Sequence, residues 1–241
     1  MKKKRLDEIL IERGIVKDKE EAFITVTEGS IFVGGQKAVS PAQMYLADAP
    51  LRLKERFPYV GRGGLKLAAA FRHSGISVEG KVCADIGAAT GGFTDVMLQN
   101  GARKVYAIDT GTGKLALKLR EDPRVVVMEQ TNILYLEALP EPIEFASIDV
   151  SFTSLRLVLP ALKKFLTSKA EVVALFKPQY EVHDANLHHG IVESDSVREG
   201  ALTEFVAWAA SGGWDVNGSV ESPIPGAKGN MEYLVYLSSI K

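Results

Sequence analysis

The chain has 241 residues, of which 46% are hydrophobic and 24% charged, and its formal net charge at pH 7 is -1. This is an ordinary globular composition and predicts one or two domains. The single cysteine, Cys83, excludes an internal disulfide and favours a reducing cytoplasm. No apolar run is long enough to cross a membrane, and the basic N-terminus lacks the apolar segment of a signal peptide.

The charges are unevenly distributed along the chain. Residues 1–72 hold 14 Lys and Arg against 9 Asp and Glu, whereas the remainder holds 15 against 21. A basic N-terminal part suggests a polyanionic partner, but a solvated surface with uneven charge explains so small an excess equally well. Charge alone therefore favours the simpler explanation.

The first part of the chain predicts a small helix–helix–hairpin module. A short apolar face over residues 6–15 predicts a helix that ends near Gly14, and a second helix is expected over residues 19–28. The stretch SIFVGGQKAV predicts two strands around a Gly34–Gly35 turn, and one more strand is expected within DAPLRLKERF. We assign residues 1–56 to this module and residues 57–60 to a linker.

From residue 61 to 241 apolar strands and helices alternate. Strands are expected at residues 81–87, 104–109, 124–129, 145–150 and 171–177, and helices at 65–76, 93–102, 113–122, 154–166 and 197–213. Residues 214–237 predict two strands around a Pro/Gly turn. This alternation predicts an α/β, Rossmann-like domain with a mostly parallel sheet, helices on both faces and an antiparallel C-terminal strand.

A glycine loop follows the first strand of this domain, in VCADIGAATGGFTDVML. The dinucleotide pattern G-x-G-x-x-G fails at Ala89, and the P-loop pattern fails because Phe93 stands where the phosphate-binding lysine belongs. The remaining pattern, D-x-G-x-x-x-G-G, suits S-adenosylmethionine, which has an amino acid end and a nucleoside end.

Individual residues of this region have expected roles in cofactor binding. Asp85 would hold the ligand ammonium directly or through water, Asp109 the ribose hydroxyls, and Asn132 would lie by the adenine. The full candidate set is Asp85, Gly87, Ala88, Thr90, Gly91, Gly92, Phe93, Thr94, Asp109 and Asn132. A plain turn with a capping aspartate is the alternative, but the ordered set favours the cofactor site.

Four charged residues are expected at the same edge of the sheet: Lys66, Asp149, Lys177 and Glu232. Asp149 and Lys177 end parallel strands, and Glu232 begins the reversed last strand, so all three should lie near the glycine loop. Two lysines beside two carboxylates can tune one amine to accept a proton from a poor acid such as a ribose 2′-hydroxyl. Singly, each residue is more often part of a structural salt bridge; as a set, they favour catalysis.

The chain resembles the TlyA (hemolysin A) family of ribosomal RNA 2′-O-methyltransferases, whose catalytic domain is similar to the FtsJ type. The resemblance covers nearly the whole chain through GRGGLKL, ADIGAATGGFTDVML, SIDVSF, LFKPQYEV and GAKGNMEYLVYL. It implies that the family's catalytic tetrad falls on the four charged residues above, with Lys177 as the base. It further implies methylation of cytidine 2′-hydroxyls, by some members in both ribosomal subunits and by others in the large one alone; the short termini here favour the latter.

The first module resembles the ribosomal S-four-type RNA-binding domain, matched by LIERG, EEA and EGSIFVGGQKA. The expected phosphate contacts are Lys2, Lys3, Lys4, Arg5 and Arg13, with Arg62 at the junction. The second helix departs from the family because EEAFITVTEG is acidic and apolar where Lys and Arg are usual. A catalytically idle RNA-binding assembly factor is the alternative function, and the intact tetrad and glycine loop argue against it.

Other conspicuous residues receive weaker interpretations. His183, His188 and His189 share one loop, but without cysteine or regular acidic spacing they predict a substrate-side loop rather than a metal site. Trp208 and Trp214 are expected in the core. Tyr180 would either stack on a flipped base or pack internally. No segment has the amphipathic character of a membrane-active helix.

Overall fold

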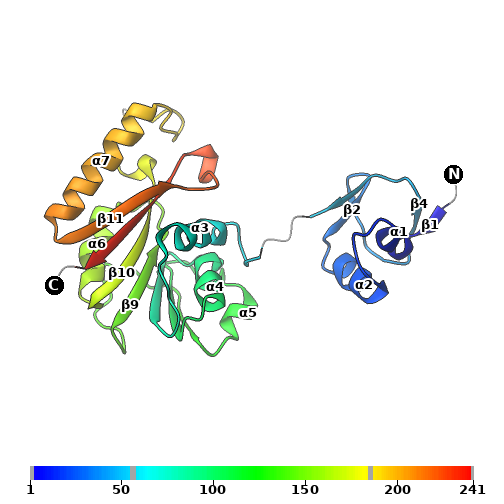
Figure 1. Cartoon of the computed structure of the whole chain (residues 1–241), viewed down its shortest axis with the longest axis horizontal. Coiled ribbons are helices and arrows are strands. Elements are labelled where there is room, and N and C mark those ends of the chain that lie inside the picture. Colours follow the sequence, from blue (N-terminus) through cyan, green and yellow to red (C-terminus); the bar gives the residue numbers. More distant parts are fainter. Residues whose placement is uncertain (1–2, 55–57, 184–186, 240–241) are drawn as a thin grey trace. The chain divides into compact units, whose positions relative to one another are not determined.

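The structure is a computed structural model that describes residues 3–54, 58–183 and 187–239. The chain divides into two compact units, Met1–Phe57 and Pro58–Lys241 (Figure 1). The division falls within the expected linker of residues 57–60. Pro58 and Val60 are held on the second unit, because the Val60 N–H donates to the Asp95 carboxylate (2.8 Å) and the Gln99 amide donates to the Pro58 carbonyl (2.9 Å).

The first unit contains two helices and two small sheets. Its elements are β1 (Lys3–Arg5), α1 (Leu6–Glu12), α2 (Lys19–Thr27), β2 (Ile31–Val33), β3 (Gln36–Lys37), β4 (Met44–Leu46) and β5 (Leu51–Leu53). Strands β1 and β4 form an antiparallel pair, and β3, β2 and β5 form a second antiparallel sheet in that order. Apolar residues from both helices and from β2, including Leu6, Leu10, Val26 and Ile31, make a core of its own.

The second unit is built on a seven-stranded sheet. Its helices are α3 (Gly64–Ser74), α4 (Gly92–Gln99), α5 (Leu117–Arg120), α6 (Leu155–Lys163) and α7 (Asp195–Ser211), with short 3-10 turns η1 (Pro178–Tyr180) and η3 (Ala227–Gly229). Its strands are β6 (Val82–Ile86), β7 (Lys104–Ile108), β8 (Val125–Met128), β9 (Ile143–Ile148), β10 (Leu166–Phe176), β11 (Trp214–Glu221) and β12 (Tyr233–Ser239).

The strand order is β11-β12-β10-β9-β6-β7-β8. Strands β10, β9, β6, β7 and β8 pair in parallel, and β12 runs antiparallel to both β10 and β11. The predicted fold is confirmed, including the reversed C-terminal strand. Because the parallel strands share one direction, their carboxyl ends meet at one edge of the sheet.

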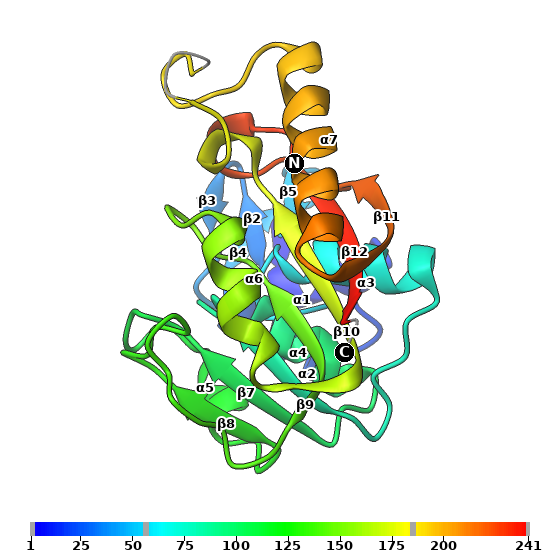
Figure 2. The same ribbon diagram turned by 90° about the vertical axis from the view of Figure 1, so that its left-hand side faces the viewer.

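Helices cover both faces of this sheet (Figure 2). Leucines of α6 and Phe205 of α7 pack with one face, whereas residues of α3, α4 and α5 pack with the other. All five residues of β6 are buried, as expected for a central strand covered on both sides. Burial raises the pKa of the Cys83 thiol in this strand to about 12, so the thiol is unreactive at neutral pH.

None of the helices in the described residues is long and apolar enough to span a membrane.

Candidate active site

The glycine loop connects β6 to α4 and packs tightly against the end of β9. Gly87 has φ +86°, and a Cβ at this position would lie 2.3 Å from the Asp149 carbonyl oxygen. Gly91 has φ +92° at the start of α4, where a Cβ would lie 2.2 Å from a Leu119 methyl. Both positions combine a left-handed backbone with no space for a side chain, so only glycine fits.

Asp85 supports the loop from beneath. Its carboxylate is fully buried and accepts hydrogen bonds from the Thr94 N–H (2.9 Å), the Thr94 hydroxyl (2.7 Å) and the Ser147 hydroxyl (3.1 Å). Burial raises its pKa to about 6, against the lowering effect of these donors, and the nearby Asp149 raises it further. Asp85 and Thr94 therefore fix the first turn of α4 onto the sheet, and their side chains do not reach a cavity surface.

One cavity of about 270 Å³ lies beside Asp109 and Asn132, at the ends of β7 and β8. Asp109 accepts from the Ala89 N–H (2.8 Å) and the Gly111 N–H (2.7 Å), which fixes the glycine loop from a second side. Ile86, Ile133 and Val158 give the cavity apolar walls, and Lys114 also lines it. The cavity offers an acidic group next to an apolar surface, the combination that a nucleoside requires.

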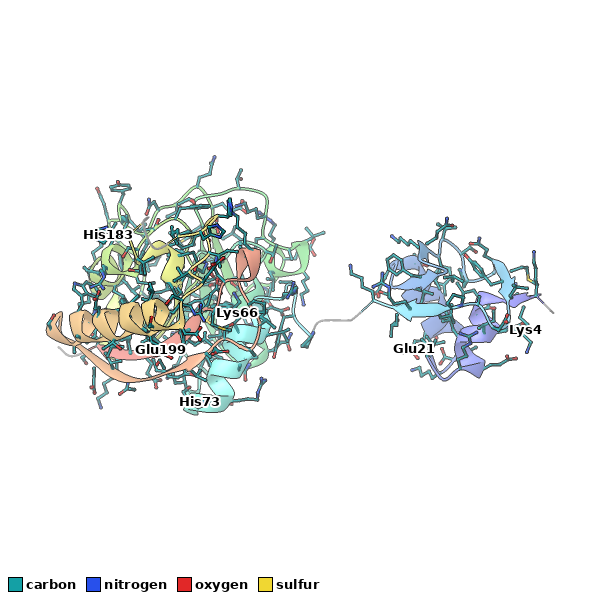
Figure 3. The ribbon with its side chains drawn as sticks, turned by 90° about the horizontal axis from the view of Figure 1, so that it is seen from above. Lys4, Glu21, Lys66, His73, His183 and Glu199 are labelled. Atoms are coloured by element: carbon teal, nitrogen blue, oxygen red, sulfur yellow. The ribbon has the colours of Figure 1, made fainter. Side chains whose placement is uncertain are left out.

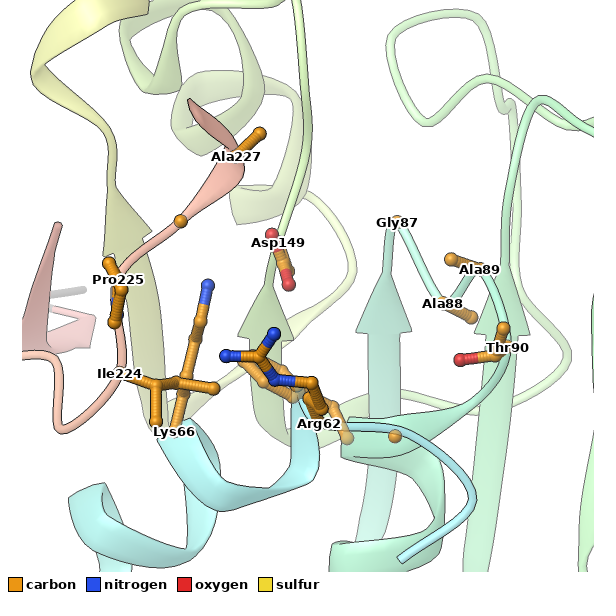
Figure 4. Close-up of a pocket in the computed structure, with 14 residues that line it drawn as sticks. Arg62, Lys66, Gly87, Ala88, Ala89, Thr90, Asp149, Ile224, Pro225 and Ala227 are labelled. Atoms are coloured by element: carbon orange, nitrogen blue, oxygen red, sulfur yellow. The ribbon is translucent and has the colours of Figure 1, made fainter. Parts of the chain in front are cut away.

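A second cavity of about 380 Å³ lies on the other side of Gly87, and both cavities share Gly87, Ala89 and Asp149. The predicted residues Gly87, Ala88, Thr90, Gly92 and Phe93 line it; Gly91 lines neither cavity. Figure 4 shows Lys66 and Asp149 pointing into this space, with residues 224–227 along one wall and residues 87–90 along the other.

The four predicted charged residues form two close ion pairs. Lys66 of α3 (Figure 3) donates from Nζ to Glu232 Oε2 at 2.5 Å, and Lys177 Nζ lies 2.6 Å from Asp149 Oδ1. Lys177 also donates to the Ser151 hydroxyl at 3.3 Å. Both lysines are nearly buried, at 7% and 8% exposed, and Glu232 is 2% exposed.

Strand register explains why these residues converge. Ile86 pairs with Ile148, so Asp149 lies next to the glycine loop, and Ala174 pairs with Ile148 on the other side of β9. Phe176 pairs with Tyr233 at the end of the antiparallel ladder, so Lys177 and Glu232 both lie directly beyond it. A buried pair, Lys66–Glu232, and a partly buried pair, Lys177–Asp149, thus lie at the carboxyl edge of the sheet, and Lys66 and Asp149 line one cavity there.

Comparison with known proteins agrees with this geometry. Residues 59–239 match the family described as FtsJ-like methyltransferase. The chain belongs to the FtsJ-like methyltransferase family. The family prediction from the sequence is confirmed.

Full-length relatives narrow the relationship. The 16S/23S rRNA (cytidine-2′-O)-methyltransferase TlyA of Mycobacterium tuberculosis is 38% identical over 239 residues, covering 97% of this chain and 89% of its own. A solved structure from Streptococcus thermophilus, named as a candidate hemolysin, is 44% identical, covers 100% of this chain and 90% of its own, and has a TM-score of 0.77. An S-adenosylmethionine-dependent methyltransferase from Mesorhizobium loti shares the fold at 15% identity and a TM-score of 0.55, covering 74% of this chain and all of its own. The predicted relationship to TlyA and hemolysin A is confirmed, while the S-four-type domain stays a prediction.

The Pro/Gly turn before β12 was expected from the sequence, but the roles of Gly226 and Asn230 within it were not. Gly226 lines the Lys66 cavity, and a Cβ there would lie 1.8 Å from Glu232 Oε1. Asn230 is 3% exposed and joins this turn to residues 190–192: its amide donates to the Gly190 carbonyl (2.9 Å) and accepts from the Val192 N–H (3.2 Å). The GAKGNME motif is the signal that marks both residues.

Phe152 and Tyr180 form an aromatic pair beside the Asp109 cavity, and only Tyr180 was singled out from the sequence. Phe152 is 88% exposed, has φ +61° and lines that cavity. Its ring lies 5.2 Å from that of Tyr180, whose ring centre lies 6.0 Å from Lys177 Nζ. Glu181 holds the two segments together by accepting from the Ser154 hydroxyl (2.7 Å) and the Leu155 N–H (2.6 Å). The position of Phe152 in the SIDVSF motif, three residues after the site residue Asp149, was the sequence feature that could have identified it.

The predicted RNA-binding cations occupy different environments. Lys4 pairs with Glu12 at 2.6 Å, Arg5 pairs with Asp7 at 2.6 Å, and Arg13 donates to the carbonyls of Ala47 and Ala49. Lys3 is exposed and Lys2 lies outside the described residues. Arg62 lines the Lys66 cavity (Figure 4).

The histidines form no metal site within the described part of the chain, where no cluster of three metal-ligating side chains occurs. His188 instead pairs with Glu193 at 3.0 Å. Trp214 is buried and Trp208 packs against the core, as expected.

Proposed function

We propose that this protein transfers a methyl group from S-adenosylmethionine to the 2′-hydroxyl of a cytidine in ribosomal RNA, with large-subunit RNA as the principal substrate. The observation that carries the proposal is the convergence of two lysine–carboxylate pairs, one buried and one partly buried, at a cavity that adjoins a glycine loop. The name of the tuberculosis relative supports cytidine and the 2′-oxygen. Such an activity belongs in the cytoplasm, in agreement with the single unpaired cysteine.

The cavity residues fit S-adenosylmethionine. Asp109 would hold the ribose, Asn132 and Ile133 would lie by the adenine, and the bare backbone at Gly87 leaves room for the ligand to pass between the two cavities. When bound, the cofactor supplies an electrophilic methyl group on sulfur. Asp85 would act indirectly, by fixing the first turn of α4 under the loop.

Lys177 would act as the base that accepts the proton of the 2′-hydroxyl. Lys177 itself lines neither cavity, but its partner Asp149 lines both and its partner Ser151 lines the Asp109 cavity. Asp149 orients it, and Lys66, held by Glu232, would align the hydroxyl from the opposite wall. Transfer from a sulfonium is an in-line displacement, which gains chiefly from such positioning.

Phe152 and Tyr180 would hold the target base outside the RNA stack. A large apolar side chain that stays exposed at the rim of a cavity offers a flat surface to an unstacked base. The base would then lie beside Lys177 without entering the sheet.

Tritiated S-adenosylmethionine with ribosomal subunits and with purified ribosomal RNA tests the function. We expect label in RNA from wild type, with the label at a cytidine 2′-oxygen, and a loss of at least about 100-fold in Lys177→Ala. No label from wild type in either substrate would favour the alternative of an idle assembly factor.

Lys81→Ala is the matched control. Lys81 also forms a lysine–carboxylate pair, with Glu171 at 2.7 Å, but lies at the amino end of the sheet. We expect it to label RNA within about twofold of wild type, because it breaks an ion pair without touching the cavity. Equal losses in Lys81→Ala and Lys177→Ala would contradict a specific role for Lys177.

A further inference from the structure

The first unit of the protein has cations in two kinds of setting. Three basic residues near the start of the unit are engaged internally: Lys4 and Arg5 of β1 pair with Glu12 and Asp7, and Arg13, directly after α1, donates to two backbone carbonyls. A cation whose hydrogen-bond donors are already used gains little from a phosphate, since the existing partner must first be released. Three of the six expected phosphate contacts, Lys4, Arg5 and Arg13, are therefore weakened by their own neighbours.

The cations of the three-stranded sheet are different. Lys37, Arg52 and Lys54 are exposed, and among the described residues no carboxylate lies within ion-pair distance of any of them. They are free to neutralise an outside anion. Lys3, Lys17 and Lys19 are exposed as well, but the sheet cations are distinguished by their position on paired neighbouring strands.

Strand register places these cations on one face. Phe32 of β2 pairs with Lys37 of β3 on one side and with Arg52 of β5 on the other. Residues directly opposite one another share a face, so Lys37, Phe32 and Arg52 form a row across the sheet. The neighbours Ile31 and Val33 are buried in the core of the unit, so this row lies on the outer face. The Lys54 N–H bonds to the Ser30 carbonyl (2.6 Å), which continues the ladder and places Lys54 two residues beyond Arg52 on the same side.

The centre of the row is a cation–aromatic pair. The Arg52 guanidinium carbon lies 4.4 Å from the centre of the Phe32 ring. A guanidinium that lies over a ring keeps donors for phosphate or a base edge, and both groups can stack on an unpaired base. A sheet face with a central aromatic residue and flanking cations is suited to single-stranded or loop RNA.

We infer that this outer sheet face, defined by Phe32, Lys37, Arg52 and Lys54, is the main RNA contact of the first unit and binds an unpaired segment of the substrate RNA. The inference rests on the proposed function for the identity of the RNA, but its test measures binding and not methyl transfer. Helix α2 is acidic in its first turn and exposes Phe23 and Ile24, so it is a poor surface for the RNA backbone. The outer sheet face is therefore the better RNA contact.

The test measures binding of a fluorescently labelled fragment of large-subunit ribosomal RNA to the full chain by anisotropy at several salt concentrations. We expect the double variant Lys37→Gln/Arg52→Gln to weaken binding at least about tenfold and to reduce the slope of log K against log salt by about one for each cation removed. Lys169→Gln, which removes an exposed cation from the second unit, should leave both quantities unchanged.

Two further variants separate charge from stacking. Arg52→Lys keeps the charge but loses the planar contact, so binding should weaken about threefold or more at an unchanged salt slope. Phe32→Leu should behave in the same way. Thermal unfolding of each variant confirms that the small sheet is intact.

Unchanged RNA binding by a folded Lys37→Gln/Arg52→Gln variant would overturn the inference. Weakened binding to whole ribosomal subunits with unchanged binding to naked RNA would also overturn it, because the face would then contact a ribosomal protein. If wild type binds the RNA through this face but transfers no methyl group, the inference stands and the proposed function fails.

Discussion

The buried Asp85 carboxylate beneath the glycine loop makes the stability of the fold depend on pH. Its side chain is fully buried, and burial raises its pKa to about 6 from an ordinary value of 3.8. A carboxyl group with a raised pKa in the folded state stabilises the fold while it is protonated. That contribution is complete below pH 3.8 and is lost as the pH rises through about 6.

Asp85→Asn should therefore remove a pH-dependent penalty. The oxygen of the introduced amide would accept from Thr94 and its NH₂ would donate to the Ser147 hydroxyl, so the hydrogen bonds survive. Between pH 4.5 and 8, the free energy of unfolding of wild type should fall by about 2 kcal/mol relative to the variant. Denaturant unfolding at several pH values measures the difference, and parallel pH curves for the two proteins would refute the role of Asp85.

Residue-scale prediction from the sequence succeeded where position along a strand determines location. Asp149 and Lys177 were expected at one edge because parallel strands end together, and their side chains lie 2.6 Å apart. The direction of a side chain was harder to predict. Asp85 was expected to hold the ligand ammonium directly or through water; its contact with Thr94 beneath α4 is a further role that no local pattern reveals.

The turn from Ser222 to Asn230 is the element that places Glu232. It is closed by hydrogen bonds from the Ser222 N–H to the Glu232 carbonyl (2.8 Å) and from the Gly226 N–H to the Asn230 carbonyl (2.8 Å). Gly226 has an ordinary φ of -76°, so glycine is required there by space and not by backbone conformation. The Glu232 carboxylate occupies the volume that a side chain would take.

Gly226→Ala should consequently slow methyl transfer while the protein stays folded. The added methyl would displace Glu232 and break its pair with Lys66, and we expect at least about a tenfold loss of kcat with the affinity for S-adenosylmethionine within about threefold. Gly200→Ala in α7 is the control, because open space surrounds Gly200. Single-turnover labelling measures the rate, and a Gly226→Ala rate equal to wild type would show that the turn does not position Glu232.

Elements were predictable when they were long or strictly periodic. The alternation of strand and helix identified every strand of the parallel sheet, and the Gly34–Gly35 hairpin was found as expected. The pair β1–β4 was missed, since each strand has three residues and the pairing spans the whole unit. Helix α5 was expected over residues 113–122 but covers Leu117–Arg120, because the preceding segment packs along the glycine loop, where the Ala116 N–H bonds to the Thr90 carbonyl.

At the scale of the whole molecule, two units have separate apolar cores that share no residue. The sequence placed the boundary after Pro58, since hairpin-type spacing there gives way to alternating strands and helices. The engagement of the cations within the first unit was not predictable, because it depends on tertiary contacts: Lys4 pairs with Glu12 across β1 and α1, and Arg13 donates to the Ala47 carbonyl from a segment distant in sequence. Which cations of the first unit are available to bind RNA thus depends on tertiary contacts that the sequence did not reveal.

Removal of residues 1–57 should separate cofactor binding from RNA binding. The truncated protein keeps both cores of the second unit and the anchoring contacts of Pro58 and Val60, so it should fold and bind S-adenosylmethionine within about threefold of the full chain. It should lose the sheet face of the first unit, so its KM for ribosomal RNA should rise at least about tenfold, with kcat at saturating RNA reduced far less. Calorimetric titration with the cofactor and steady-state labelling at varied RNA concentration measure the two effects. A truncated protein that labels RNA with an unchanged KM would show that the second unit alone recognises the substrate, whereas loss of cofactor binding would show that the two units do not function independently.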